Sequence, residues 1–329
     1  MNFGVIGSAH SHIFSIINDI IRLGGQLKGV FNDKTDNVSK IVEKYNAPIY
    51  DDINELFKQK IEIACTSAVN NMKLEVIQAC YENNVHVMAD KPIVVDKEQY
   101  GQIEKIISSG KIQVGLNLSL RFDPTVYTLK KLIDDGAIGQ LLSVEIFSPH
   151  KLSPESRPEW HFNKNQCGGI TVDLIVHSID AFNWITGSKI VEYSGIVTKS
   201  ILKEKPDFYD ISRFMVLGST GISGYFRTDW HIPDKYWSWG DIRIFCTGSN
   251  GLVEARVVGD PITKEKGVIL YDMDKEIKYA EVVNSGKTAT IDFIDRIEGR
   301  KHLITHEDIL ETTKLSIDFD QSAKITNFI

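Results

Sequence analysis

An acidic residue and a histidine one helical turn apart are the first side chains in this chain whose types and spacing could do chemistry. In the stretch CGGITVDLIVHSID, Asp173, His177 and Asp180 stand at i, i+4 and i+7, so a helix would place all three on one face. A histidine oriented by a carboxylate can act as a general base near neutral pH. A solvated polar face has the same spacing, so this pattern alone favours neither interpretation.

A lysine follows another short apolar run, in the stretch MADKPIV. Pro92 fixes its own backbone angle and restricts Lys91 to an extended conformation. A lysine held in this way can hydrogen-bond a substrate hydroxyl and stabilise negative charge that develops on it. A surface lysine in a turn is the alternative, and spacing does not separate the two.

The amino-terminal stretch FGVIGSAHSH has the pattern of a strand, a turn and a helix, with an apolar run that ends at Gly7. The three glycines of a dinucleotide-binding turn fall here on Gly7, Ala9 and His12, and His12 is the largest departure. The start of a helix still offers N–H groups and a positive dipole end to an anion. The stretch therefore predicts either a cofactor site or an ordinary turn.

The second apolar run, in KGVFNDK, is expected to end at Asn32, where a dinucleotide fold places a ribose-binding residue. Asn32 could bond a ribose hydroxyl without repelling a 2′-phosphate, whereas Asp33 would favour NAD. The choice between NAD and NADP stays open at this point.

His10 and His12 also form an HxH pair that could supply two metal ligands. Further ligands would have to come from histidines that stand in no recognisable metal motif: His86, His150, His161, His177 and His231. The four cysteines lack CxxC spacing, which is typical of reduced thiols. We therefore predict no metal site.

The elements that must position these residues fall into two groups. Residues 1–118 alternate short apolar runs with helical patterns, which predicts a Rossmann-type, doubly wound parallel sheet whose ligands bind at the carboxyl ends of its strands. Residues 119–329 contain alternating runs joined by glycine turns, which predicts an α+β domain with a large open mixed or antiparallel sheet. One of its helices should end at Gly187, and its last helix could pack back on the first domain.

The charge and the apolar composition of the chain limit the kinds of ligand that we expect it to bind. A net charge of −7 and a pI near 5.8 argue against nucleic acid, because phosphate binding needs a clustered positive field. No signal sequence and no apolar run of about 18 residues is present, so we expect a soluble cytoplasmic protein with small-molecule ligands.

Taken in order, these motifs resemble the family of glucose-fructose oxidoreductase, inositol dehydrogenase and MocA (Gfo/Idh/MocA), over nearly the whole chain. Each motif is weak alone, but their order and spacing together are specific. The stretches that carry the resemblance are FGVIGSAHSH, HVMADKPIV, VGLNLSLRFDP, RPEWHFN, CGGITVDLIVHSIDAFNWITG, CTGSNGLVEAR and DFIDRIEGR with THEDILETTKLSIDFDQSA.

The resemblance implies an NAD(P)-dependent dehydrogenase or reductase that acts on a sugar, a polyol or a related small molecule. It implies that His177 takes the hydroxyl proton, that Lys91 orients the hydroxyl and that Asp173 positions its neighbours. It also implies NAD or NADP as the cofactor, with NAD favoured, and a homodimer or homotetramer formed through the second domain, which binds the substrate.

The resemblance further implies a set of binding residues. Those expected at the cofactor are Gly7, Ala9, His10, His12, Asn32, Asp33, Ser67, Asn70 and Asp90. Those expected at the substrate are Arg121, Trp160, His161, Asp180 and Tyr236.

The chain departs from the family pattern at several positions: Asp90 replaces a glutamate, Cys167 replaces a glycine, and Ala9 and His12 occupy the turn. Two other functions stay open. One is a non-catalytic sensor of a sugar or nucleotide, and the other is NAD-assisted cleavage of a glycoside.

Overall fold

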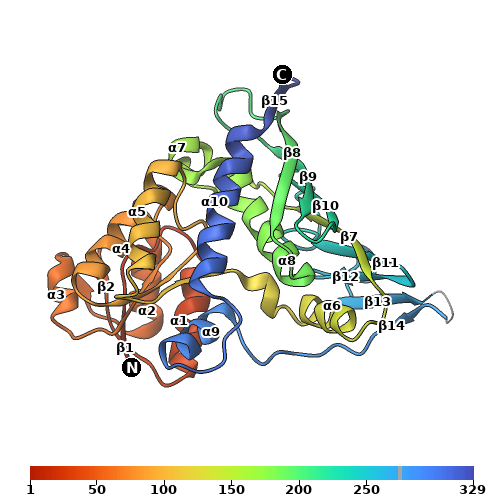
Figure 1. The fold of residues 1–329 in the computed structure, drawn as a ribbon. Helices are drawn as coiled ribbons and strands as arrows, with labels where there is room; N and C mark the ends of the chain where they lie inside the picture. Colours follow the sequence, from red (N-terminus) through yellow and green to blue (C-terminus); the bar gives the residue numbers. More distant parts are fainter. Residues whose placement is uncertain (273–275) are drawn as a thin grey trace. The chain divides into compact units, whose positions relative to one another are not determined.

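The computed structural model describes residues 1–272 and 276–329, and its chain forms two compact units (Figure 1). Unit 1 comprises residues 1–118, 165–168 and 287–314. Unit 2 comprises residues 119–164, 169–286 and 315–329. Two short segments from the later part of the chain therefore complete the amino-terminal unit.

Unit 1 is built on a six-stranded sheet in the order β3-β2-β1-β4-β5-β6, and every neighbouring pair of strands is parallel. Its strands are β1 Asn2–Val5, β2 Gln26–Phe31, β3 Ile49–Tyr50, β4 Ile63–Thr66, β5 His86–Ala89 and β6 Val114–Leu116. This confirms the predicted Rossmann-type sheet. The pattern did not reveal β3, because two residues are too short for any periodicity to show.

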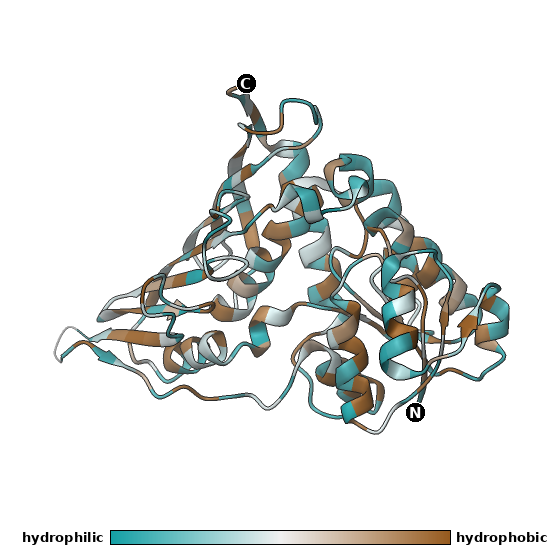
Figure 2. Cartoon of the chain, turned by 180° about the vertical axis from the view of Figure 1, so that it is seen from behind, coloured by the Kyte–Doolittle hydropathy of each residue, from teal (hydrophilic) through white to brown (hydrophobic). Residues whose placement is uncertain are grey.

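Helices cover both faces of this sheet. They are α1 Ile13–Arg22, α2 Asp36–Tyr45, α3 Ile53–Phe57, α4 Lys73–Glu82, α5 Lys97–Ser108 and α9 Ala289–Ile297. Because crossovers between parallel strands are right-handed, α1 lies on one face, where it contacts α9, and α4 and α5 contact each other on the opposite face. Figure 2 shows these helices with apolar residues on one side and polar residues on the other.

The core of unit 1 lies on both sides of the strands. Phe3, Val5 and Ile63 in the central strands are at most 1% exposed, as expected for parallel strands that are covered on both faces. Helix α9 approaches β6 so closely that a Cβ on Gly115 would lie 2.6 Å from Cδ2 of Phe293. Gly115 therefore allows a helix from the end of the chain to close this side of the sheet.

Unit 2 is built on a nine-stranded sheet in the order β14-β13-β12-β11-β7-β10-β9-β8-β15. Its strands are β7 Leu141–Pro149, β8 Ile190–Lys199, β9 Ile211–Gly218, β10 Ser223–Asp229, β11 Arg243–Gly248, β12 Gly251–Arg256, β13 Gly267–Asp272, β14 Lys278–Tyr279 and β15 Lys324–Asn327. The pairs β7–β10 and β8–β15 are parallel and the others are antiparallel, which confirms the predicted large mixed sheet.

The helices outside the Rossmann-type sheet include the one that carries His177. They are α6 Pro124–Asp134, α7 Lys164–Cys167, α8 Val176–Thr186 and α10 His306–Ser322. A π-helical turn, Thr171–Ile175, leads directly into α8. Helix α8 ends at Gly187, which has a left-handed φ of 63°, as the sequence predicted.

The structure contains no helix, within the residues that it describes, with both the length and the apolar composition needed to cross a membrane.

The start of α10 is fastened to the edge strand of unit 1. Nε2 of His306 accepts a hydrogen bond from the Val114 backbone N–H at 3.1 Å, and Arg296 donates to the Val114 carbonyl. Burial, followed by the positive charges of Arg296 and His302, lowers the pKa of His306 to about 4. The imidazole therefore accepts this bond in its neutral form.

We expect this histidine to make unit 1 less stable in acid. The folded pKa lies below the unfolded value, so the unfolded chain binds more protons, and the free energy of unfolding falls as the pH drops from about 6.5 to 4. Because the ring is partly exposed, we expect a loss of about 2 kcal/mol. Urea unfolding at pH 7 and pH 4.5 measures this loss in the unchanged protein and in His306→Gln. Equal losses in the two proteins would contradict the assignment.

Candidate active site

The β1–α1 turn has room only for glycine at its first position. Gly7 has a φ of +91°, and a Cβ there would lie 2.5 Å from Cβ of Ala68 and 2.9 Å from Oγ1 of Thr66. Its carbonyl accepts from the backbone N–H of Ser67 at 3.0 Å. The turn is therefore packed directly against the loop that follows β4, at the carboxyl edge of the sheet.

Asn32 and Asp33, the two residues expected at the cofactor ribose, form hydrogen bonds with different parts of unit 1. Strand β2 ends one residue earlier than predicted, before Asn32. The Asp33 carboxylate accepts from the backbone N–H of Ser8 and from the Thr35 backbone N–H, the latter at 3.1 Å. Nδ2 of Asn32 donates to Asp51 at 2.8 Å. Asp33 thus holds the β1–α1 turn, while Asn32 lies against the neighbouring loop.

Ser67 and Asn70 hold backbone segments in place. Oγ of Ser67 donates to the His10 carbonyl at 2.7 Å, and the His10 N–H donates to the Ser67 carbonyl at 3.0 Å. Asn70 is 4% exposed, donates to the Cys167 carbonyl and accepts from Lys73, both at 2.9 Å. These two predicted cofactor residues therefore fasten the loop after β4 to its neighbours.

A buried lysine that the sequence analysis missed organises the loop after β5. Lys73 is fully buried, and its Nζ donates to Oδ1 of Asn70 and to the carbonyls of Asp90 and Pro92, each at 2.9 Å. The carbonyls flank Lys91, which is 8% exposed and precedes a cis peptide bond to Pro92. The available signal was a lysine at the first position of α4, where a helical pattern predicts an exposed side chain.

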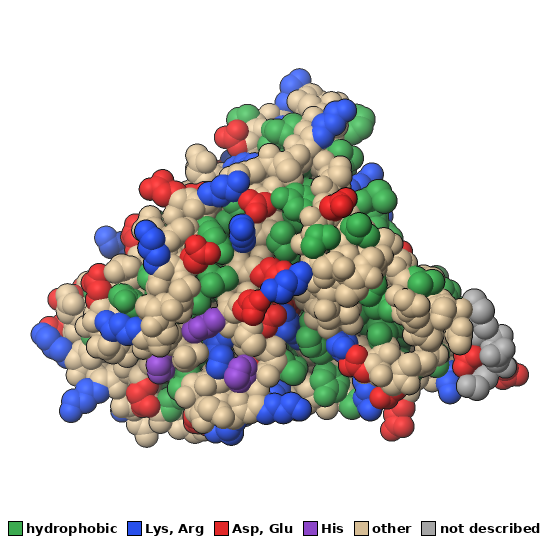
Figure 3. Space-filling view, viewed as in Figure 1, with side chains coloured by type: hydrophobic (Ala, Val, Ile, Leu, Met, Phe, Trp, Pro, Cys, Tyr) green, Lys and Arg blue, Asp and Glu red, His purple; other side chains and the backbone are tan. Residues whose placement is uncertain are grey.

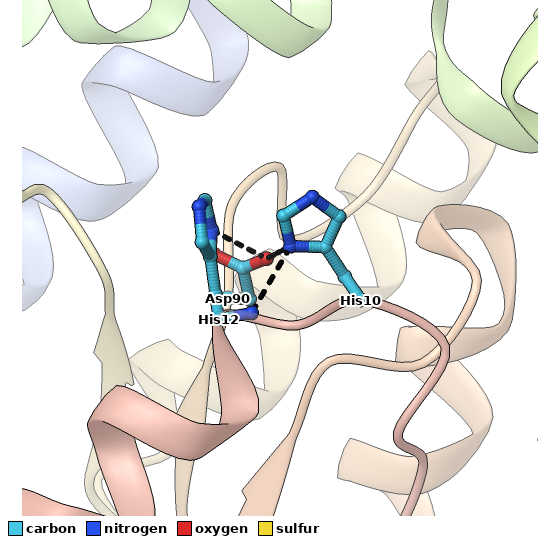
Figure 4. A group of neighbouring side chains, drawn as sticks. All are labelled: His10, His12 and Asp90. Carbon is cyan, nitrogen blue, oxygen red and sulfur yellow. Dashed lines mark hydrogen bonds and ion pairs between the residues drawn. The ribbon is translucent and has the colours of Figure 1, made fainter. Parts of the chain in front are cut away.

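Two imidazole rings meet the carboxylate of Asp90 at the same edge of the sheet (Figure 4). Nδ1 of His12 lies 3.0 and 3.1 Å from the two carboxylate oxygens, and Nδ1 of His10 lies 3.4 Å from Oδ2. The rings are 4.1 Å apart and nearly perpendicular. Thus the residue that replaces the third glycine turns its ring toward the end of β5.

The Asp90 side chain is buried, whereas those of His10 and His12 are 32% and 45% exposed. Figure 3 likewise shows histidine side chains at the molecular surface. Burial raises the pKa of the Asp90 carboxyl, but the charge and hydrogen bond of His12, with the charges of Lys73 and His10, outweigh it and hold this pKa well below its ordinary value. Asp90 is therefore a buried carboxylate with two partly exposed imidazoles above it.

In unit 2, Asp173, His177 and Asp180 differ in how deeply they are buried. Asp173 and His177 are half-buried, whereas every other residue of 170–182 is buried. Three residues of an α-helix turn by about 300°, so Asp180 lies about 60° around the axis from His177, and its side chain is buried against Arg121. The i, i+4, i+7 spacing therefore predicts neighbours around the helix axis but not which of them is buried.

Asp173 has a cationic neighbour that the sequence analysis did not single out. Burial lowers the pKa of Arg157, and the negative charge of Asp173 partly offsets this effect. The Arg157 guanidinium lies 4.6 Å from the Trp230 ring centre and donates to the Leu152 carbonyl at 2.8 Å. Arg157 is the first residue of RPEWHFN, one of the stretches that carry the family resemblance. Its place in that motif was the signal that could have identified it.

The predicted aromatic substrate residues have different surroundings. His161 is 6% exposed, and its ring centre lies 5.2 Å from that of Trp230 and 6.3 Å from that of Phe208. Trp160 is half-buried beside it, and Tyr236 is half-buried between β10 and β11. Their contact with a substrate stays a prediction.

Arg121 and Asp180 form an ion pair inside unit 2. Nε of Arg121 lies 3.0 and 3.1 Å from the two carboxylate oxygens, and Nη2 lies 2.6 Å from Oδ1. Both side chains are at most 3% exposed. Each therefore neutralises the other's charge, and their predicted contact with a substrate remains untested.

The predicted residues divide between the two units. All nine expected at the cofactor, together with Lys91, belong to unit 1. Asp173, His177 and all five expected at the substrate belong to unit 2.

Two family models match the chain. Residues 1–117 match the model described as an oxidoreductase family with an NAD-binding Rossmann fold, and residues 126–254 match the Gfo/Idh/MocA carboxyl-terminal domain. The chain belongs to the Gfo/Idh/MocA oxidoreductase family. This confirms the resemblance that the motifs indicated.

Curated relatives of this family member share about a quarter of their aligned residues with it. Inositol 2-dehydrogenase 2 of Saccharopolyspora erythraea is 24% identical over 66% of this chain and 62% of its own length. Myo-inositol 2-dehydrogenase of Thermotoga maritima is 23% identical over 58% of this chain and 55% of its own length. In both, the alignment spans less than two thirds of the relative.

Solved structures match over nearly the whole chain. One from Erwinia carotovora atroseptica SCRI1043 is 27% identical with a TM-score of 0.90, and the alignment covers 99% of both chains. Aldose-aldose oxidoreductase of Caulobacter crescentus, complexed with glycerol, is 17% identical with a TM-score of 0.79, over 98% of this chain and 97% of that one. The second likeness concerns the fold alone.

We expect the Arg121–Asp180 pair to stabilise unit 2. Asp180→Asn leaves a buried guanidinium without its counter-charge, so the free energy of unfolding should fall by about 3–5 kcal/mol in urea unfolding. The control is Asp135→Asn, which breaks an exposed ion pair with Lys131 and should cost less than about 1 kcal/mol. Replacing Arg121 by Met and Asp180 by Leu together should cost less than Asp180→Asn alone. Similar losses in the two Asp→Asn variants would contradict this assignment.

Proposed function

We propose that this family member is an NAD(P)-dependent oxidoreductase that transfers hydride between the nicotinamide and a hydroxyl or keto carbon of a sugar, a polyol or a related small molecule. The observation that carries the proposal is the presence of Lys91 in the family-matched Rossmann region and of Asp173 and His177 in the family-matched carboxyl-terminal region. The two other functions considered from the sequence have no such support.

The turn of unit 1 fits a dinucleotide. Gly7 leaves no room for a Cβ, α1 begins at the turn without a side-chain cap, and the Asp33 carboxylate lies at the end of β2. The His12 ring, which would otherwise crowd the turn, is drawn to Asp90. In the proposal, the β1–α1 turn holds the diphosphate and Asp33 meets the adenosine ribose. The bound nicotinamide accepts or supplies the hydride.

Each of the three catalytic residues has one role in the proposal. His177 takes the hydroxyl proton during oxidation and returns it during reduction, and Asp173 orients this imidazole from one turn earlier. Lys91 donates a hydrogen bond to the substrate oxygen and stabilises the negative charge that develops on it. The buried Lys73 supports this role, because it fixes the carbonyls on both sides of Lys91.

Polyols and sugars are the proposed substrates because the relatives are named inositol dehydrogenases, and one, from Pseudarthrobacter phenanthrenivorans, is named levoglucosan dehydrogenase. Trp160 and Tyr236 offer half-buried ring faces of the kind that stack on sugars.

A homo-oligomer is also part of the proposal. Large apolar side chains are exposed on the strands of the unit 2 sheet: Leu142, Val191, Met215 and Leu252. A second copy of the chain could cover this surface.

We expect Lys91→Met and His177→Gln to lower kcat by about 100-fold or more, because each removes a group that acts on the substrate oxygen. The measurement is NAD(P)H formation with myo-inositol, levoglucosan and a panel of aldoses. Lys105→Met and His302→Gln replace exposed or partly exposed residues of the same types and should keep kcat unchanged. Near-normal kcat in the first two variants would contradict the mechanism.

We further expect NAD to bind more tightly than NADP, because the Asp33 carboxylate repels a 2′-phosphate. Asp33→Asn removes the charge and keeps an acceptor for the Ser8 N–H, so it should improve the affinity ratio for NADP by about 10-fold or more. Separate calorimetric titrations with NAD and NADP measure the ratio. An unchanged ratio would contradict the role of Asp33, and failure of both nucleotides to bind would favour a sugar sensor.

A further inference from the structure

The cluster of His10, His12 and Asp90 combines residues from two distant parts of the chain. The HxH pair lies in the β1–α1 turn, and Asp90 directly follows β5 (Figure 4). One ring nitrogen from each histidine and a carboxylate oxygen all lie within 4.8 Å of one another. The sequence offered only two of these three groups as neighbours.

The distances match those between ligands that share one metal ion. A metal ion about 2.0–2.2 Å from each nitrogen and oxygen ligand holds neighbouring ligand atoms about 2.8–3.6 Å apart, from octahedral to tetrahedral angles. Oδ2 of Asp90 lies 3.1 Å from Nδ1 of His12 and 3.4 Å from Nδ1 of His10. The carboxylate already lies at ligand-to-ligand distance from both nitrogens, and the histidine ligand atoms, within 4.8 Å of each other, would move closer to share one ion.

Two electron-rich atoms of the cluster, Nδ1 of His10 and Oδ2 of Asp90, lie close together. The His12 backbone N–H donates to Nδ1 of His10 at 3.3 Å, so this nitrogen presents its lone pair. The same nitrogen lies 3.4 Å from Oδ2 of the Asp90 carboxylate. Two such atoms repel each other unless a cation lies close to both.

The surroundings hold the ligands and leave the ion accessible. Asp90 is fixed through its backbone, whose N–H donates to Thr66 and whose carbonyl accepts from Lys73. The backbone of His10 is fixed by two hydrogen bonds with Ser67: its carbonyl accepts from the Ser67 hydroxyl, and its N–H donates to the Ser67 carbonyl. Because the imidazoles are 32% and 45% exposed, an ion can enter from solvent and keep coordination positions for water or an anion.

We propose that His10, His12 and Asp90 bind one divalent transition-metal ion. Two imidazoles and one carboxylate form a donor set that suits Zn²⁺, Fe²⁺, Co²⁺ and Ni²⁺ better than Mg²⁺ or Ca²⁺. The positive charge of Lys73 and the negative charge of Asp90 cancel each other. A bound divalent ion would therefore make the site positively charged, and the site would attract an anionic group. The metal site goes beyond the proposed dehydrogenase function and does not rest on it.

The test is a Co²⁺ titration of chelator-treated, tag-free protein, followed by the visible d–d absorption of the ion and by displacement with Zn²⁺. We expect one Co²⁺ per chain. His10→Gln, His12→Gln and Asp90→Asn should each weaken binding by about 100-fold or more, because each removes a ligand. His302→Gln, a histidine outside the cluster, should bind Co²⁺ as the unchanged protein does.

Unfolding midpoints of all variants show whether the fold is kept. If Asp90→Asn is unstable, the two histidine variants still test the site, because these side chains are partly exposed. Absence of stoichiometric Co²⁺, or equal binding by the histidine variants, would overturn the proposal and leave protons as the cations of the cluster. Titration of the same samples with NAD and NADP reports on the dehydrogenase function separately, so failure of one proposal is distinguishable from failure of the other.

Discussion

The buried ammonium of Lys73 is the interaction on which the edge of unit 1 depends. It joins three oxygen acceptors from the loops after β4 and β5, including the carbonyls on both sides of Lys91. A buried cation is costly unless its donors are all used and a counter-charge is near, and here the Asp90 carboxylate supplies that charge. One side chain thereby fixes the backbone that presents Lys91 and the backbone that presents Asp90.

The β1–α1 turn shows how this family member keeps its geometry with one glycine of three. Only Gly7 stands where a Cβ would clash, so it alone is demanded by the backbone. Ser8 is fastened by Asp33, and the His12 ring is drawn to Asp90. The imidazoles of His10 and His12 thus form a cluster with Asp90. They give the turn nitrogen atoms that can bind a proton or a metal ion, which glycines cannot do.

In unit 2, burial separates residues that the helical pattern placed together. Asp173 and His177 are the polar pair at the less buried side of the π-helical turn and α8, and Arg157 adds a positive charge near Asp173. Asp180 instead neutralises Arg121 in the interior. The same motif therefore supplies both a candidate catalytic pair and a buried ion pair.

The amino-acid sequence by itself determined the parallel sheet, the mixed sheet, the end of α8 at Gly187 and the family, because hydrophobic periodicity and motif order are local properties of the chain. It did not reveal β3 or β15, since such short edge strands bury too few residues to show a period, and it did not reveal α9 although most residues of this helix are buried. Nor did it reveal the buried role of Lys73 or the meeting of His10 and His12 with Asp90. Those depend on which loops meet at the carboxyl ends of neighbouring strands, and the pairing of β1 with β4 and of β4 with β5 decides that only in three dimensions.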